Sequence, residues 1–98
     1  MFKLLKVEKS KNKNKRYDAY YYVGDKIKKT SFGSPKHENY TIHKDKERRK
    51  RYRDRHKNDN LDDPTSAGAL SWFLLWGEST SLKDNIDNYG SNFNKSAK

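Results

Sequence analysis

Large aliphatic and phenylalanine side chains are scarce in this 98-residue chain, which has seven Leu, three Ile, two Val and four Phe. This low content of large apolar side chains, combined with a formal net charge of +10, falls within the composition range of chains that do not fold. Seven Tyr and two Trp offset the shortage, because each aromatic side chain can bury on the order of 150–250 Å². We therefore expect one small domain whose core depends on aromatic residues.

The absence of cysteine excludes a disulfide framework and a thiolate metal site. The first seven residues contain too few apolar side chains for a signal-peptide core, and no apolar run approaches the length that spans a bilayer. The sequence therefore predicts an intracellular protein that is not secreted and does not insert into a membrane.

Three segments near the start of the chain have strand character. Phe2–Glu8 is the first, and Tyr17–Val23 and Lys26–Phe32 are rich in residues that favour strands. The dipeptide Gly24-Asp25 separates the last two segments and places Gly where a type II′ turn requires it. These features predict a β-hairpin, extended to a meander if the first strand joins it.

A two-residue turn fixes the register of this hairpin. Tyr22 would face Ile27, and Tyr17 would face Phe32 on the opposite surface. Both surfaces then mix aromatic residues with lysines, so the pattern does not decide which surface is buried.

Segments without clear periodicity connect and end these elements. Residues 9–16 form a run of Lys and Asn that we expect to be a mobile basic loop. Residues 37–43 predict an extended connector in which a further strand could form. One domain is expected over residues 1–93, followed by a disordered tail at 94–98.

The remainder of the chain predicts three helices. The first spans 44–57, with acids early and bases late, and Tyr52 and His56 as a narrow docking stripe. The second spans Ser66–Trp76 and carries the apolar stripe Ala69, Trp72, Phe73 and Trp76, with Leu70 and Leu74 on the adjoining face, so we expect it to be enclosed as the core. The third follows Ser79–Ser81 with apolar positions at Leu82, Ile86, Tyr89 and Phe93. The predicted fold class is α+β, a small N-terminal antiparallel β-hairpin or meander followed by three helices.

The predicted helix at 44–57 concentrates positive charge over about 21 Å. It contains nine basic residues against three acids, and these nine are the candidate binding residues: Lys44, Lys46, Arg48, Arg49, Lys50, Arg51, Arg53, Arg55 and Lys57. Guanidinium groups match phosphate oxygens, and neutralised phosphates release counterions whatever the base sequence. The segment therefore predicts binding of DNA or RNA without strong sequence preference.

The same positive charge is also compatible with different roles. The helix could bind an acidic protein or lipid, or its charges could simply face solvent with support from pairs such as Glu47 and Arg51. Lysines of residues 9–16 and 26–29 surround Tyr20–Tyr22 in the sequence, an arrangement that could serve single-stranded nucleic acid, although these tyrosines are also expected in sheet packing.

Catalytic and metal sites are not predicted. His37, His43 and His56 are separated by intervals that match no compact metal-ligand motif. No nucleophile or second acid–base group is placed beside His56 by the sequence. We expect a non-enzymatic protein without a cofactor or metal, in which Trp72 and Trp76 hold the core.

Residues 32–89 contain, in order, FG, YTIHKDKERRKRYRDRH, DPTSAGALSWFLLW and SLKDNI. This order resembles that of short, basic, uncharacterised proteins of large nucleocytoplasmic DNA viruses. The resemblance implies a protein of the infected host cell that could be packaged in the virion. It raises the expectation of contact with a viral genome or, alternatively, of a small structural or scaffolding protein that binds acidic viral proteins. It supplies no catalytic residue.

Overall fold

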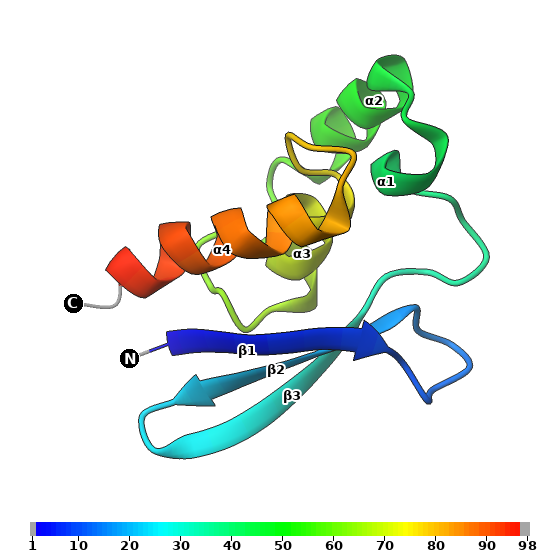
Figure 1. Ribbon diagram of the computed structural model, residues 1–98. Helices are drawn as coiled ribbons and strands as arrows, with labels where there is room; N and C mark the ends of the chain where they lie inside the picture. The colour runs from blue at the N-terminus through cyan, green and yellow to red at the C-terminus, as the bar shows by residue number, and fades with distance from the viewer. Residues whose placement is uncertain (1, 97–98) are drawn as a thin grey trace.

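The computed structural model describes residues 2–96, with side chains described for residues 2–90. A three-stranded sheet lies on one side, and the helices all lie on its other side (Figure 1). The fold is α+β, an antiparallel meander followed by helices, as the sequence predicts. Within the described residues, no helix has both the length and the apolar character needed to cross a membrane.

The sheet consists of β1 (Phe2–Lys9), β2 (Tyr17–Val23) and β3 (Lys26–Phe32) in the order β1-β2-β3, with both pairs antiparallel. Gly24 has a φ of 64°, whereas Asp25 has no positive φ, which agrees with a type II′ rather than a type I′ turn. The loop before β2 begins after Lys9, which is the last residue of β1 rather than part of the predicted loop.

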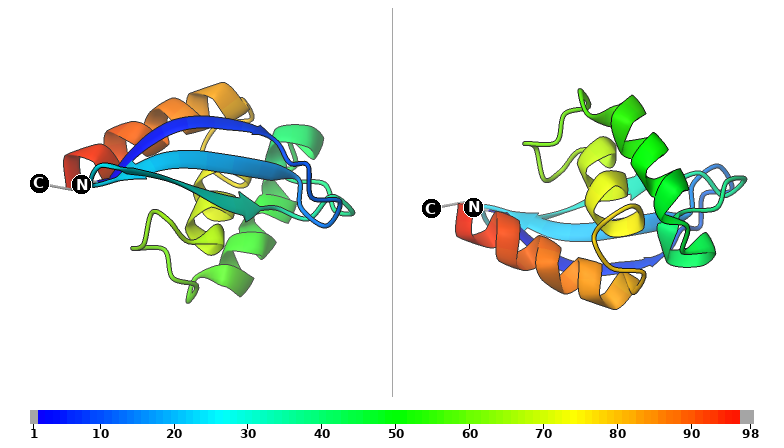
Figure 2. Two further views of the ribbon diagram at one scale, coloured as in Figure 1. Left: turned by 90° about the horizontal axis from the view of Figure 1, so that it is seen from below. Right: turned by 90° about the horizontal axis from the view of Figure 1, so that it is seen from above.

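The hairpin has the predicted register. Tyr22 pairs with Ile27, and Tyr17 pairs with Phe32. The surface that the sequence left undecided is now assigned: Phe32 is fully buried, whereas Ile27 is 58% exposed. The sheet therefore buries the surface of Tyr17, and its other surface faces away from the helices (Figure 2, left).

The prediction of an extended connector at residues 37–43 is wrong over its second half. Tyr40–His43 forms a short helix, α1. The side chain of Asn39 caps it by accepting a hydrogen bond from the Thr41 N–H, and Lys44, with a φ of 57°, ends it in the left-handed region. An Asn cap satisfies an otherwise unpaired donor of the first turn, which an alternating strand pattern does not provide.

The predicted basic helix is confirmed as α2, which spans Lys46–His56. Asp45 is its N-cap and accepts hydrogen bonds from the N–H groups of Glu47 and Arg48. Two of the nine candidate binding residues lie outside the helix, because Lys44 closes α1 and Lys57 is the C-cap of α2.

The second predicted helix is not regular. It comprises α3 (Ala67–Leu70), capped by the Ser66 side chain, and the π-helix η1 (Ser71–Leu75). Its burial agrees with the prediction for Ala69, Leu70 and Leu74 and differs for Trp72. Leu70, Leu74 and Leu75 are buried in the core beside Ala69, whereas Trp72 and Trp76 are only half-buried. The wider π-turn places two consecutive leucines in the core, Phe73 and Trp76 pack against it, and both tryptophans also contact Tyr52 of α2.

The last helix, α4, spans Leu82–Ser96 and begins where the Ser81 hydroxyl accepts a hydrogen bond from the Asp84 N–H. It packs along β1 and against η1, where Tyr89 is fully buried. The described helix includes residues 94–96 of the predicted tail. Residues 97 and 98 and the Phe93 side chain lie outside what the structure describes.

The molecule has two tiers above the sheet. Phe2, Ala19, Tyr21 and Phe32 from the sheet pack against Leu70, Leu74, Leu75 and Tyr89 from α3, η1 and α4 to form the core. The α2 helix lies farther from the sheet, beside α3 (Figure 1; Figure 2, right). Because α2 has no buried residue, it must be held by contacts at its surface.

Candidate anion-binding cleft

At 3.6 residues per turn, the basic residues of α2 divide into three stripes along the helix. One stripe faces the end of η1 and contains Arg49 and Arg53. A second lines a cleft and contains Arg48, Arg51 and Arg55. The third, which we call the outer stripe, faces solvent and contains Lys46, Lys50 and the C-cap residue Lys57.

Arg49 and Arg53 hold α2 against the end of η1. Arg49 Nε donates hydrogen bonds to the carbonyl oxygens of Gly77 at 2.7 Å and Trp76 at 3.2 Å. Arg53 Nε donates to the Trp76 carbonyl at 3.0 Å, and its guanidinium lies 4.4 Å from the centre of the Trp72 ring. These donors satisfy carbonyls that the end of a helix leaves unpaired. Both residues are among the nine predicted to bind nucleic acid, and the structure shows that their Nε groups attach α2 to the end of η1.

Burial lowers the pKa of the Arg53 guanidinium, as does the neighbouring Arg49. An arginine nevertheless stays charged at neutral pH because its ordinary pKa is about 12.5 or above. The bonds that attach α2 are therefore charge-assisted.

The predicted Tyr52 and His56 stripe also docks α2. The Tyr52 ring stacks on Trp76, with centroids 4.3 Å apart and planes 4° apart, and on His56, with centroids 4.2 Å apart. Burial raises the pKa of Tyr52 to about 12, so its hydroxyl is protonated at neutral pH. Together these rings form one aromatic wall of the cleft.

The cleft has a volume of about 570 Å³ and lies between segments that are far apart in the sequence. Its walls are α2, the loop of residues 33–39, and one side of α3 and η1 up to Trp76, with Lys15 contributed by the loop after β1. Its charged residues are Lys15, Arg48, Arg51, Arg55, Glu38 and Asp59. Four cations face two acids, so the cleft has a positive formal charge.

Each acid of the cleft has a cationic or titratable partner. Glu38 lies 3.6 Å from Arg48, and Asp59 lies 2.9 Å from Nδ1 of His56. Arg51 and Arg55, by contrast, are exposed and have no hydrogen-bond or ion-pair partner among the described residues. Their guanidinium groups are therefore the cleft cations most available to a ligand.

Arg16 fixes the loop that forms the opposite wall. Its side chain donates to the carbonyl oxygens of Ser34 at 3.3 Å, Pro35 at 3.3 Å and His37 at 2.9 Å. Gly33, with a φ of 83°, begins this loop, and a Cβ there would lie 2.9 Å from Leu75 Cδ1. The loop is therefore held by hydrogen bonds to Arg16 and by the close contact of Gly33 with Leu75.

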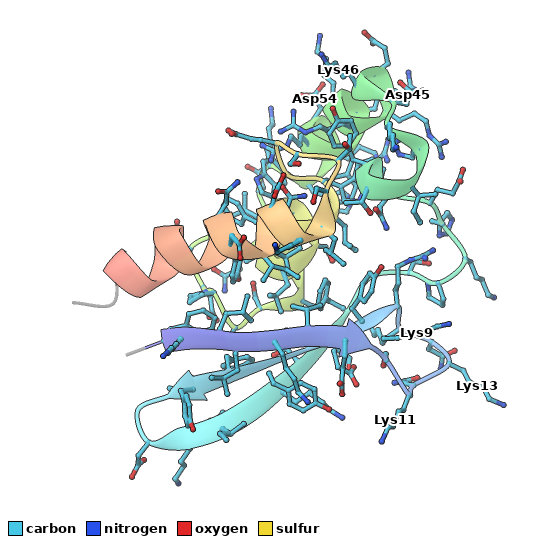
Figure 3. All side chains as sticks on the ribbon, viewed as in Figure 1. Lys9, Lys11, Lys13, Asp45, Lys46 and Asp54 are labelled. Atoms are coloured by element: carbon cyan, nitrogen blue, oxygen red, sulfur yellow. The ribbon has the colours of Figure 1, made fainter. Side chains whose placement is uncertain are left out.

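Lysines of the loop after β1 have different positions. Lys15 lines the cleft, whereas the side chains of Lys11 and Lys13 extend away from the body of the molecule (Figure 3). Lys46 likewise points outward from the N-terminal end of α2 (Figure 3). Of the tyrosines for which two roles were open, Tyr21 is in the core, whereas Tyr20 and Tyr22 lie on the open surface of the sheet.

Two buried donor groups near the cleft lack partners among the described residues. Asn39 lines the cleft and is 2% exposed; its Oδ1 accepts from the Thr41 N–H at 3.0 Å, and its Nδ2 has no hydrogen-bond partner. His43 Nδ1 accepts from the Asp45 N–H, and its buried Nε2 has no partner. Burial lowers the pKa of His43, so its neutral form is favoured. Asn39 was not identified as a cleft residue from the sequence; the feature that could have drawn attention to it is that Asn is a favourable helix cap.

The histidines are dispersed around the cleft rather than gathered. His37 shares a hydrogen bond with the Ser34 hydroxyl at 2.9 Å, and His56 pairs with Asp59. Within the part of the chain that the structure describes, no three His, Cys, Asp or Glu side chains form a group that could hold a metal ion.

A family model matches residues 5–56, which is more than half of the chain. The chain belongs to the DUF5754 family, a family of unknown function. In this DUF5754 protein the match runs from β1 to the end of α2 and includes the four cations of the cleft. No curated protein and no solved structure matches the chain.

Proposed function

We propose that this DUF5754 protein is a non-enzymatic nucleic-acid-binding protein that holds phosphate groups in the cleft beside α2. The observation that carries the proposal is the stripe of Arg48, Arg51 and Arg55, which line one concave surface with Lys15 on the other side. This is a narrower set than the nine residues that the sequence singles out, because Arg49 and Arg53 are engaged with η1 and the four lysines of that set do not line the cleft.

Phosphate is the ligand group that best suits these side chains. A guanidinium presents planar pairs of N–H donors that match two oxygens of a phosphate, and it carries its charge at every physiological pH. Each phosphate neutralised by the cleft would release counterions, so affinity should fall steeply with salt and depend little on base sequence.

The resemblance of residues 32–89 to basic proteins of large DNA viruses supports a more specific context. In that context, the nucleic acid is a viral genome or transcript, met in the infected cell or in the virion. A viral acidic protein is the alternative partner, because its carboxylates would satisfy the same guanidinium groups.

The test compares duplex DNA, single-stranded RNA and a polyacidic peptide of equal charge as ligands for the full chain, over a series of salt concentrations. We expect duplex DNA and single-stranded RNA to bind at the lower salt concentrations of the series, and the peptide to bind weakly. Absence of nucleic-acid binding at low salt would overturn the proposal. Tighter binding of the peptide would indicate that the cleft binds an acidic protein rather than nucleic acid.

A matched pair of double variants locates the site. Arg51→Gln with Arg55→Gln removes two charges from the cleft, and Lys46→Gln with Lys50→Gln removes two from the outer stripe of the same helix. Each lost phosphate contact lowers the salt slope by about one. We expect the cleft variant to lose about two units of slope and the outer variant to change less. A larger loss of salt slope in the outer variant than in the cleft variant would show that the cleft is not the binding site.

A further inference from the structure

We infer that the cleft selects single-stranded over duplex nucleic acid and seats one phosphate against Asn39 and Arg48. This inference rests on the proposed function and specifies the form of nucleic acid that the same site accepts.

The shape of the cleft is the first reason. Its volume of about 570 Å³ lies within the roughly 300–1,000 Å³ of sites that enclose small ligands. The cleft arginines of α2, Arg48, Arg51 and Arg55, face the loop of residues 33–39 across this space. Because this loop stands in front of them, α2 cannot enter the major groove of a duplex with these arginines facing the bases. A single strand can enter, because its backbone and bases are not held in a wide, stiff helix.

The unpartnered amide of Asn39 is the second reason. A buried N–H donor without a partner is rare in folded proteins and marks a place where a ligand or an ordered water molecule can supply the acceptor. Asn39 lines the cleft, and its Oδ1 accepts from the Thr41 N–H, so Nδ2 is the group without an acceptor; Nδ2 is itself buried, and a ligand reaches it only when the side chains that cover it move aside. A phosphate oxygen is an acceptor of the required kind.

Arg48 supplies charge at the same end of the cleft. It pairs at 3.6 Å with Glu38, the residue that precedes Asn39 in the chain, and both side chains are partly exposed. An exposed ion pair of this length is weak and exchangeable. A phosphate can therefore replace the Glu38 carboxylate as the partner of Arg48.

The aromatic wall is the third reason. Tyr52, His56 and Trp76 line the cleft beside the arginines, and His56 is partly exposed at the end of their stack. Cations that follow the backbone, with aromatic rings beside them that accept bases of any sequence, are the usual combination in proteins that bind single strands. The rival surface is the outer stripe, which is convex, lacks aromatic residues and would suit a duplex.

The test measures binding of the full chain to labelled oligonucleotides of about 12 residues, a length within the site sizes known for single-strand binding. Single-stranded DNA, single-stranded RNA and duplex DNA are compared at equal phosphate concentration. We expect the single strands to bind about tenfold more tightly than the duplex, which corresponds to two or more salt-sensitive contacts that the duplex cannot make. Equal or tighter binding of duplex DNA overturns the inference, whereas failure of every nucleic acid to bind overturns the proposed function itself.

The key variant is Asn39→Asp. Asp is as good a helix cap as Asn, so the bond to the Thr41 N–H is retained while the donor is replaced by a negative oxygen. Asn88→Asp makes the same change of charge at an exposed position of α4 that does not line this cleft. We expect Asn39→Asp to weaken single-strand binding about tenfold and Asn88→Asp to have little effect. Equal affinities for the two variants overturn the assignment of Asn39.

A second pair of variants guards against a folding defect in Asn39→Asp. Arg48→Gln removes the cation at the same end of the cleft, and Lys50→Gln is its control on the outer stripe. We expect Arg48→Gln to reduce the preference for single strands, and Lys50→Gln to preserve it. Urea denaturation of all four variants establishes that each is folded, and an unchanged preference in Arg48→Gln contradicts the inference.

Discussion

Replacing Arg53 by Met tests whether this residue attaches α2 rather than binding a ligand. Met retains much of the apolar length of the side chain but removes the guanidinium that donates to the Trp76 carbonyl and lies over the Trp72 ring. A hydrogen bond to a charged group contributes roughly 1.5–3 kcal/mol, and a cation–π contact at a partly exposed site about 0.5–1 kcal/mol. Because Arg49 still donates to the same carbonyl, we expect a loss near the lower end, about 2 kcal/mol of unfolding free energy.

Urea denaturation followed by tryptophan fluorescence measures this loss, because Trp72 and Trp76 both lie at the interface with α2. Arg51→Met is the matched control, since Arg51 is exposed on the same helix and its guanidinium has no hydrogen-bond partner among the described residues. Its stability should change by less than about 0.5 kcal/mol. In a thermal scan, the loss expected for Arg53→Met corresponds to a fall in Tm of about 8–16 °C.

The two variants should therefore separate stability from binding. Arg53→Met should unfold at lower urea concentration and, where folded, retain affinity, whereas Arg51→Met should keep its stability and lose affinity. Replacing Arg49 and Arg53 together should cost more than the sum of the single losses, because the Trp76 carbonyl then loses both donors. Equal stabilities of Arg53→Met and Arg51→Met would refute the structural role.

Three further predictions concern the stability of the fold. Asn85→Asp should lower the urea midpoint at pH 7, because the amide donates to the carbonyls of Leu74 at 2.9 Å and Ser79 at 2.8 Å. Because the new carboxyl would face those oxygens, its pKa in the folded protein would lie above its unfolded value of about 3.9. The stability of the variant should therefore recover as the carboxyl is protonated at lower pH. A urea midpoint that falls with pH in parallel with that of the wild type contradicts this. Gly77→Ala should cost at least about 1–3 kcal/mol in the same assay, since its Cβ would overlap the Phe73 carbonyl oxygen, and an unchanged midpoint would show that the turn relaxes freely. Burial lowers the pKa of His43, so its contribution to stability is complete above about pH 6.5 and is lost as the pH falls through the lowered folded value. His43→Gln should accordingly have a flatter dependence of urea midpoint on pH between 7.5 and 5 than the wild type, and identical slopes would contradict this role.

The strands could be predicted because their determinants are local. A two-residue turn at Gly24 fixes the pairing of Tyr22 with Ile27, and this pairing is confirmed. The buried surface of the sheet could not be chosen from sequence, because both surfaces carry aromatic residues and lysines. That choice depends on where α3 and α4 pack, which is a long-range property of the chain.

The connector and the tryptophan segment show how local patterns compete. Tyr40 and Ile42 alternate as in a strand, yet the cap provided by Asn39 favours a helical turn. In the later segment, regular helical spacing predicts that Trp72 and Trp76 face the core. The π-turn breaks that spacing, so Leu74 and Leu75 are both buried in the core, whereas Trp76 packs against the core only partly buried and, like Trp72, contacts Tyr52 of α2.

The candidate site could be predicted only as a set of cations. Helical periodicity separates Arg49 and Arg53 from Arg51 and Arg55, but it does not indicate which stripe meets protein and which meets solvent. That distinction comes from the carbonyls at the end of η1, more than twenty residues away. Lys15 and Asn39 join the cleft from separate loops, and no local signal in the sequence predicts their proximity to α2.

The π-helix η1 also determines how α3, which precedes it, is rotated relative to the Trp76 and Gly77 carbonyls that follow it and bind α2. A π-turn is equivalent to one residue inserted into an α-helix. Deletion of a single residue within Ser71–Leu75 would restore a continuous α-helix and turn everything beyond it by about 100°. Leu70 would still cover the sheet, but the Trp76 and Gly77 carbonyls would turn away from the guanidinium groups of α2. A change of length by one residue in this segment would thus disturb both the core, to which Leu74, Leu75 and Tyr89 belong, and the attachment of α2.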